Sequence, residues 1–279
     1  MAQADIGYAL VTGASAGIGQ ATARILARQG VTVYAAARRS GPLEELAREA
    51  AGIRPIALDV TSDESMRAAM ARIESDGARI DLLVNNAGFG QMGAVEDVSV
   101  EKLRYQFEVN VFGAVRAIQA VLPGMRARRS GRIVNVSSPA GVVPMPFGGA
   151  YCASKAALES LTAALRLEVR DFGIHCILVR PGAIRTEFQE VARDGTTAFR
   201  ESSPYAGRYG SVERLFDQFS KRGSPPEPVG EGIVRAALAA SPPHEINVPF
   251  DAKATVALST VLPSVARDGI FRFALNRLG

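Results

Sequence analysis

Residues 8–19 read Tyr-Ala-Leu-Val-Thr-Gly-Ala-Ser-Ala-Gly-Ile-Gly, a short apolar run that opens into three spaced glycines. Helical spacing of apolar residues follows from Gln20 to Arg28, so the stretch predicts a strand, a glycine turn and a helix. Gly13, Gly17 and Gly19 permit positive φ angles and close backbone approach, so amide N–H groups and the helix N-terminus can face a pyrophosphate. The stretch therefore predicts a dinucleotide-binding loop; taken alone, it also fits a plain turn.

Strand-like and helix-like segments alternate from this loop onward. Strands are predicted at 32–37, 54–59, 81–85, 131–137 and 174–180, and helices at 42–50, 62–74, 99–128 and 151–171. Such alternation is typical of an α/β fold in which helices cover both faces of a doubly wound parallel sheet. No linker divides the chain, so residues 1–279 are predicted to form one Rossmann-type domain.

The last third of the chain has a different character. Residues 187–227 are polar and punctuated by Gly and Pro, which favours a substrate-binding lid. Residues 228–279 form a C-terminal extension, with a helix predicted at 228–240 and a last strand at 245–248. The final stretch, 270–278, carries two arginines among apolar residues, and we expect a docked helix there rather than a membrane anchor.

The end of the second predicted strand indicates which dinucleotide is bound. NAD-binding sites place a carboxylate there for the ribose hydroxyls, whereas this chain has Arg38 and Arg39. Two guanidiniums favour the 2′-phosphate of NADP. We therefore predict that NADP(H) is preferred and NAD(H) possible; the alternative is a solvated arginine pair before a helix.

The ends of the next two predicted strands also carry candidate residues. Asp59 follows the third strand, where it either accepts a bond from the adenine amino group or is a plain turn aspartate. The fourth strand ends in Asn85-Asn86-Ala87-Gly88, whose small residues let a cofactor lie across the strand tip. Asn110 stands in an otherwise apolar helical face, which costs stability unless its amide is hydrogen-bonded.

Ser138, Tyr151 and Lys155 are the candidate reacting groups. A strand ending at the serine and a helix beginning near the tyrosine direct them into one cleft, and Tyr151 and Lys155 are one helical turn apart. A nearby ammonium favours the phenolate and lowers the pKa of a tyrosine, which makes it usable as an acid and base. None of the three supplies a hydride, so a cofactor must. A Tyr-x-x-x-Lys pair alone is common in helices and decides nothing.

Composition narrows the class of protein. With 47% hydrophobic and 22% charged residues the chain is an ordinary globular protein, and a formal charge of +4 without basic runs argues against nucleic acid as a partner. Cys152 and Cys176 fit reduced core thiols in a cytoplasmic setting, and no metal-ligand spacing is present. No run is long enough for an integral membrane segment. His175 and His244 lack partners that suggest catalysis.

Taken together, the motifs from Thr12 to Gly19 and from Asn85 to Gly88, with Asn110, Ser138, Tyr151-Cys-Ala-Ser-Lys155 and Pro181-Gly182, resemble those of the short-chain dehydrogenase/reductase family. The resemblance covers about residues 8–186. It implies an NAD(P)-dependent oxidoreductase, a seven-stranded sheet in the order 3-2-1-4-5-6-7, and a homodimer or homotetramer packed through the helices that bear Asn110 and Tyr151. The segments around residues 34–39 and 146–155 look like the branch containing 17β-hydroxysteroid and retinol dehydrogenases.

The same resemblance implies a role for each matching residue. Tyr151 is the acid and base, Lys155 lowers its pKa and binds the nicotinamide ribose, Ser138 orients the substrate oxygen, and Asn110 holds a water in the proton relay. The cofactor residues are Gly13, Ser15, Gly17, Ile18 and Gly19 at the pyrophosphate, Asp59 and Val60 at the adenine, Asn86 and Ala87 at the adenosine ribose, and Ile184 and Thr186 at the carboxamide. Gly88, Tyr151, Lys155, Pro181 and Gly182 are also expected to bind the cofactor.

The leading functional hypothesis is NADPH-linked interconversion of a ketone or aldehyde with its alcohol, on a fairly apolar small molecule. Phe188, Phe199, Tyr205, Tyr209 and Phe216 are candidates for an apolar pocket, although core packing explains each as well. Two alternatives stay open. One is a catalytically silent dinucleotide-sensing regulator on the same fold, and the other is a nucleotide-sugar epimerase, whose glycine loop would normally read GxxGxxG.

Overall fold

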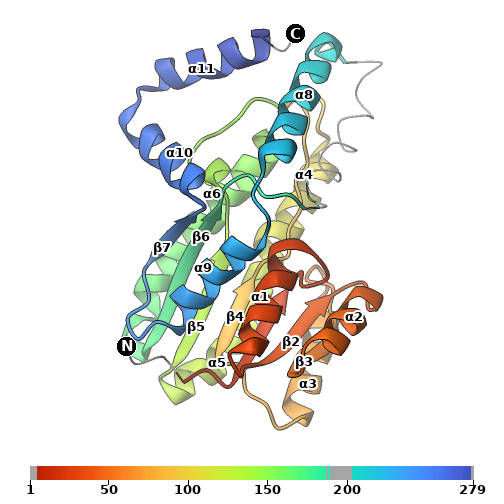
Figure 1. Ribbon diagram of the computed structural model, residues 1–279, viewed down its shortest axis with the longest axis vertical. Helices are drawn as coiled ribbons and strands as arrows, with labels where there is room; N and C mark the ends of the chain where they lie inside the picture. The colour runs from red at the N-terminus through yellow and green to blue at the C-terminus, as the bar shows by residue number, and fades with distance from the viewer. Residues whose placement is uncertain (1–4, 187, 189–202, 278–279) are drawn as a thin grey trace.

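A seven-stranded parallel sheet with the order β3-β2-β1-β4-β5-β6-β7 forms the centre of the computed structural model, which describes residues 5–186, 188 and 203–277 (Figure 1). The strands are β1 (Tyr8–Thr12), β2 (Thr32–Ala37), β3 (Ile53–Ala57), β4 (Leu82–Asn85), β5 (Gly131–Val136), β6 (Ile174–Pro181) and β7 (Glu245–Val248). The predicted fold class, strand order and strand positions are confirmed.

Helices cover both faces of the sheet because the strand side chains of both faces are apolar. One face carries α1 (Gly17–Arg28), α2 (Gly41–Glu49) and α9 (Glu227–Leu238). The other carries α3 (Asp63–Ser75), α5 (Gly113–Arg128) and α6 (Gly149–Glu168). Leu10, Leu83 and Ile133 are fully buried in the second layer, and burial of each such side chain contributes about 1.5–3 kcal/mol to folding.

The strands run parallel, so all their carboxyl ends reach the same edge of the sheet. Ser62 caps α3 by accepting a bond from the Ser65 N–H, at the start of the helix predicted over 62–74. The helix predicted to run unbroken over 99–128 is instead interrupted. It consists of α4 (Val100–Phe107), a π-helical turn at Glu108–Phe112, and α5.

Three further helices lie beyond the carboxyl edge of the sheet, in the upper half of Figure 1. They are α8 (Ala206–Arg222), α10 (Phe250–Val261) and α11 (Ser264–Arg277). The sequence predicted only the last of them, with a later start. In the part of the chain that the structure describes, no helix combines the length and the apolar character needed to cross a membrane.

Candidate active site

A cavity of about 1280 Å³ opens at the carboxyl edge of the sheet. Among the residues predicted to be catalytic or to bind the cofactor, all except Gly19 and Asn110 line it. They are Gly13, Ser15, Gly17, Ile18, Arg38, Arg39, Asp59, Val60, Asn86, Ala87, Gly88, Ser138, Tyr151, Lys155, Pro181, Gly182, Ile184 and Thr186. The fold thus brings residues from α1, α6 and the carboxyl ends of β1 to β6 to one place.

The glycine loop between β1 and α1 has the shape that a bound pyrophosphate requires. Gly13 and Gly17 have φ angles of 66° and 57°, and a Cβ at Gly17 would lie 2.8 Å from Thr186 Cγ2. The N-terminus of α1 has no side-chain cap and no acidic residue in its first turn, so its N–H groups and positive dipole end remain available to an anion. The loop fits the phosphates of a dinucleotide.

Thr12 organises the floor of this loop, a role that the sequence did not reveal. Its Oγ1 donates to Val84 O at 3.3 Å and accepts from the N–H groups of Asn86 and Ala87 at 3.1 Å each. Asn86 Nδ2 donates in turn to the Thr12 and Gly13 carbonyls, both at 3.1 Å. A Cβ at Gly19 would lie 2.5 Å from Asn86 Nδ2, so Gly19 makes room beneath the loop rather than lining the cavity.

Arg38 and Arg39 stand exposed at the mouth of the cavity, directly after β2. Arg38 Nη1 donates to the Tyr105 hydroxyl at 3.4 Å. The pKa of Asp59 is lowered, first by the hydrogen bond from the Thr61 N–H and to a lesser degree by the charge of Arg38. Asp59 Oδ1 also accepts from Thr61 Oγ1 at 2.7 Å, so this residue is a turn aspartate as well as a cavity residue.

Tyr151 lies 7% exposed at the inner end of the cavity, with its ring 5.3 Å from that of Phe188. Burial raises the pKa of Tyr151 to about 12, while a hydrogen bond with Ser138 acts in the opposite direction. The phenol is therefore fully protonated at neutral pH. Its hydroxyl is hydrogen-bonded to Ser138, the serine that the sequence predicted to share a cleft with it.

Lys155 Nζ donates to the Val136 carbonyl at 2.8 Å and lies 5.9 Å from the centre of the Tyr151 ring. Burial lowers the pKa of Lys155 to about 8, and the charge of Glu159 opposes this shift. The sequence predicted that Lys155 would lower the pKa of Tyr151. In this arrangement the pKa of Tyr151 is raised instead, because the effect of burial outweighs that of the hydrogen bond with Ser138.

Asn110 belongs to the π-helical turn and is 1% exposed. Its Oδ1 accepts from the Phe89 N–H at 3.0 Å, and its Nδ2 donates to Phe89 O at 3.0 Å and to Ser154 Oγ at 3.1 Å. These bonds satisfy the buried amide that the sequence marked as costly. A Cβ at Gly88 would lie 3.1 Å from Asn110 Oδ1 and 3.6 Å from Lys155 Nζ, which places Asn110 directly behind the cavity wall.

One part of the cavity has an apolar lining, which includes residues packed with Tyr151. Its lining includes Met92, Val143, Met145, Phe188, Val212 and Phe271. The charged lining residues among those that the structure describes are Arg38, Arg39, Asp59 and Lys155, none of which belongs to this part. Phe271 comes from α11, so the C-terminal extension closes a wall that the sequence did not assign to the site.

Of the five aromatic residues proposed for an apolar pocket, Phe188 lines the cavity. Tyr205 and Tyr209 instead fasten α8 to the loop before α4. Tyr209 is fully buried, with its hydroxyl 2.5 Å from Asp97 Oδ2, and Tyr205 donates to Glu96 Oε2 at 3.0 Å. Phe199 and the side chain of Phe216 lie outside the described part of the chain.

Comparison with known proteins identifies relatives along most of the chain. A family model described as short chain dehydrogenase matches residues 7–197. A 3-ketodihydrosphingosine reductase of Bacteroides thetaiotaomicron is 37% identical over 86% of this chain and 86% of its own length. Retinol dehydrogenase 8 of Bos taurus is 36% identical over 91% of this chain and 85% of its own length. The crystal structure of a short-chain dehydrogenase from Streptomyces avermitilis superposes with a TM-score of 0.80 at 35% identity, covering 92% of this chain and 94% of that one.

Proposed function

We propose that this chain, which belongs to the short chain dehydrogenase family, interconverts an apolar ketone or aldehyde and its alcohol with NADP(H) as the hydride partner. Membership makes it an oxidoreductase that uses a nicotinamide dinucleotide. The substrate, the preference for NADP(H) and the roles of single residues are the parts that we propose.

The observation that carries the proposal is the meeting of Tyr151 and Ser138 at the inner end of a cavity whose outer end is the glycine loop. The nicotinamide, when bound, supplies or accepts the hydride. Tyr151 gives its proton to the carbonyl oxygen during reduction and takes it back during oxidation. Ser138 holds that oxygen by a hydrogen bond, so the carbonyl carbon stays in place while the proton moves.

Lys155 and Asn110 support the tyrosine. With a pKa of about 8, Lys155 is mostly an ammonium at neutral pH and stabilises negative charge on the phenol oxygen as the proton leaves. Its Nζ is also a donor for the nicotinamide ribose. Asn110 fixes the backbone of Phe89 behind Gly88, and we retain for it the proposed role in holding a relay water.

Arg38 and Arg39 support NADP(H) as the preferred cofactor. Both are exposed at the cavity mouth directly after β2, where NAD-binding sites carry an acid. A guanidinium forms charge-assisted, bidentate bonds with a phosphate, which NADP(H) has and NAD(H) lacks at this position. NAD(H) remains a weaker alternative.

The apolar part of the cavity, which includes residues packed with Tyr151, supports a substrate without charge near its reacting carbon. A charged group in this part of the cavity would lose its water without gaining a charged partner among the described lining residues. The names of two relatives, 3-ketodihydrosphingosine reductase and retinol dehydrogenase 8, agree with a reaction between carbonyl and alcohol. We propose residues 187–227 as the segment that covers the substrate, and residues 228–279 as an extension of the same single domain.

Turnover with a panel of steroids, retinoids and aliphatic ketones and aldehydes tests the proposal, each with NADPH and with NADH. We expect oxidation of NADPH with at least one apolar compound. Compounds of matched length that carry a carboxylate near the carbonyl serve as controls and should be poor substrates. NADPH binding without turnover across the whole panel would contradict the proposal and favour a dinucleotide-sensing regulator.

A further inference from the structure

Three consecutive residues at the end of β5 bind three positions of α6 that are spaced by four residues. Ser138 bonds to Tyr151, the carbonyl of Val136 accepts from Lys155, and Ser137 Oγ donates to Glu159 Oε1 at 2.8 Å. Of the three α6 residues, Tyr151 and Lys155 are candidate reacting groups. Glu159 repeats the pattern one turn further along the same helix face, although the proposed mechanism does not use it.

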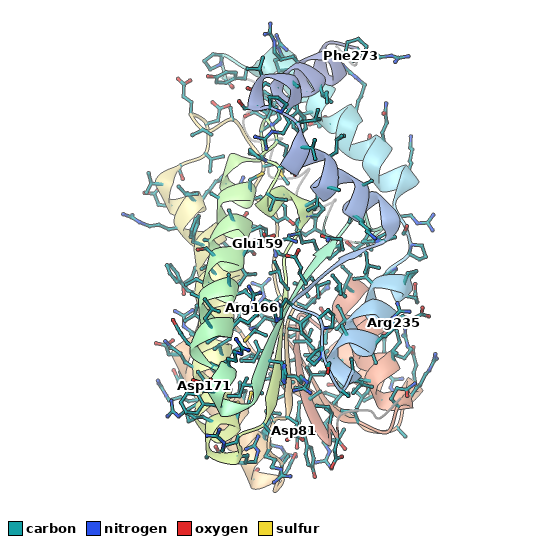
Figure 2. All side chains as sticks on the ribbon, turned by 90° about the vertical axis from the view of Figure 1, so that its left-hand side faces the viewer. Asp81, Glu159, Arg166, Asp171, Arg235 and Phe273 are labelled. Atoms are coloured by element: carbon teal, nitrogen blue, oxygen red, sulfur yellow. The ribbon has the colours of Figure 1, made fainter. Side chains whose placement is uncertain are left out.

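Glu159 is also joined to the neighbouring strand. Its two carboxylate oxygens accept from Arg180 Nε at 2.9 Å and Nη2 at 2.8 Å, and the two side chains are only 10% and 8% exposed. Arg180 lies on β6 immediately before Pro181-Gly182, at the cavity. Figure 2 marks Glu159 on the side of α6 that faces the sheet. A bidentate pair at this burial fixes geometry more firmly than an exposed one does.

Two further contacts place Glu159 at a junction. A Cβ at Gly141 would lie 2.6 Å from Glu159 Oε1, so the loop after Ser138 packs directly on the carboxylate. Arg180 Nη1 donates to Glu245 Oε2 on β7 at 2.9 Å, and the side chain of that glutamate is 54% exposed. The buried carboxylate of Glu159 therefore connects α6 with the loop after β5 and with the end of β6.

We propose that Glu159 is a positioning residue for Tyr151 and Lys155, which holds α6 in register with the ends of β5 and β6 and supplies the negative charge that keeps Lys155 an ammonium. This inference rests on the proposed function. Glu159 contacts neither the apolar part of the cavity nor the glycine loop, so it acts through the residues that it holds.

The charges around Lys155 support the second part of the role. Glu159 on its own helix raises the pKa of Lys155 against the effect of burial. Other charged and titratable groups near this region are Tyr151 and Cys152 on α6, Arg180 on β6 and, behind it, Glu245 on β7. Without the Glu159 charge, Arg180 would be a buried cation on the same side, and the pKa of Lys155 would fall further.

The test is the pH dependence of kcat/KM for carbonyl reduction at saturating NADPH, compared between the wild type and Glu159→Gln. Lys155 acts as an ammonium, so activity is retained below its pKa and lost above it. We expect the alkaline limb of Glu159→Gln to move by about one pH unit to lower pH, with activity near that of the wild type at the acid end. Glu245→Gln is the matched control, because it removes a carboxylate from the same arginine at an exposed position, and its limb should not move.

Glu159→Asp distinguishes the effect of the negative charge from the effect of the side-chain length. It keeps the charge but shortens the side chain, so we expect a lower kcat with the limb unmoved; it also serves if Glu159→Gln does not fold. An unchanged pH profile and kcat in both variants would overturn the inference, as would an equal loss at every pH in Glu159→Gln and Glu245→Gln. Absence of turnover in the wild type would instead defeat the proposed function and the inference with it.

Discussion

Arg38 is the residue on which the proposed cofactor preference most depends. It is exposed at the cavity mouth and contacts the Tyr105 hydroxyl at 3.4 Å; after the hydrogen bonds from Thr61, its charge also helps to lower the pKa of Asp59. In Arg38→Ala we expect kcat/KM for NADPH to fall about tenfold or more, because a charge-assisted bond is lost, while kcat/KM for NADH changes little. Arg28→Ala, at an exposed position outside the cavity, is the control. An equal fall with both cofactors would contradict the assignment.

At the scale of single residues, the sequence predicted which reactive groups lie close together. It did not predict which hydrogen bonds those groups form. Tyr151 and Lys155 share a helix face because of their spacing alone, so their joint position was predictable. The bond from Lys155 to the Val136 carbonyl depends on how α6 packs against β5, and local spacing contains no such information. The same holds for Thr12, whose hydroxyl joins two strands that are distant in the chain.

Helix α8 is the element whose attachment we expect to control access to the apolar part of the cavity. Val212 of α8 lines that part, and the buried Tyr209 hydroxyl joins Asp97 and accepts from the Ala94 N–H at 2.9 Å. Tyr209→Phe should therefore raise KM for an apolar substrate several-fold, leave the Kd for NADPH unchanged, and speed amide hydrogen exchange in α8.

Tyr205→Phe is the matched control for this change, because its hydroxyl bonds to Glu96 at an exposed position. The water around Tyr205 replaces the lost bond, so KM should stay near that of the wild type. Identical behaviour of the two variants would argue against α8 as a wall held by Tyr209.

At the scale of elements, strong apolar periodicity predicted the central strands and helices within a few residues. The π-helical turn at 108–112 was not predictable, since a single wider turn changes neither composition nor overall periodicity. It adjoins the site, where Asn110 bonds to the backbone of Phe89. Helix α10 was also missed, because its apolar residues are spread around the helix instead of forming one stripe.

Across the whole molecule, exposed apolar side chains on the outer helices support the proposed homodimer or homotetramer. Leu103 on α4, Phe112 in the π-helical turn, and Leu161 and Leu167 on α6 are 36%, 49%, 45% and 71% exposed. These helices are those that bear Asn110 and Tyr151 or adjoin them. Apolar surface of this kind is typical of an interface between copies.

Leu167→Glu tests this proposal by light scattering. A charge at a position already 71% exposed costs the folded chain little, but it would lose its water at an interface, so we expect a smaller molecular mass than in the wild type. Val265→Glu on α11, where the valine is 81% exposed, is the control and should keep the wild-type mass. A monomeric wild type would contradict the proposal.

The overall architecture was predictable because each predicted strand is followed by a helix, and right-handed crossovers leave few ways to arrange such units. The covering of the cavity by α8, α10 and α11 was not. The positions of those helices depend on packing around a cavity that exists only in the folded chain. Phe271 of α11, for example, forms part of the cavity wall.

Tyr151→Phe tests the proton-transfer role of Tyr151 most directly. The ring keeps its place against Phe188, 5.3 Å away, while the hydroxyl that bonds to Ser138 is removed. With a carbonyl substrate that the wild type reduces, we predict that kcat falls about 10²- to 10⁴-fold. The Kd for NADPH, measured by fluorescence titration, should be unchanged. Turnover near the wild-type rate with NADPH bound normally would contradict the account.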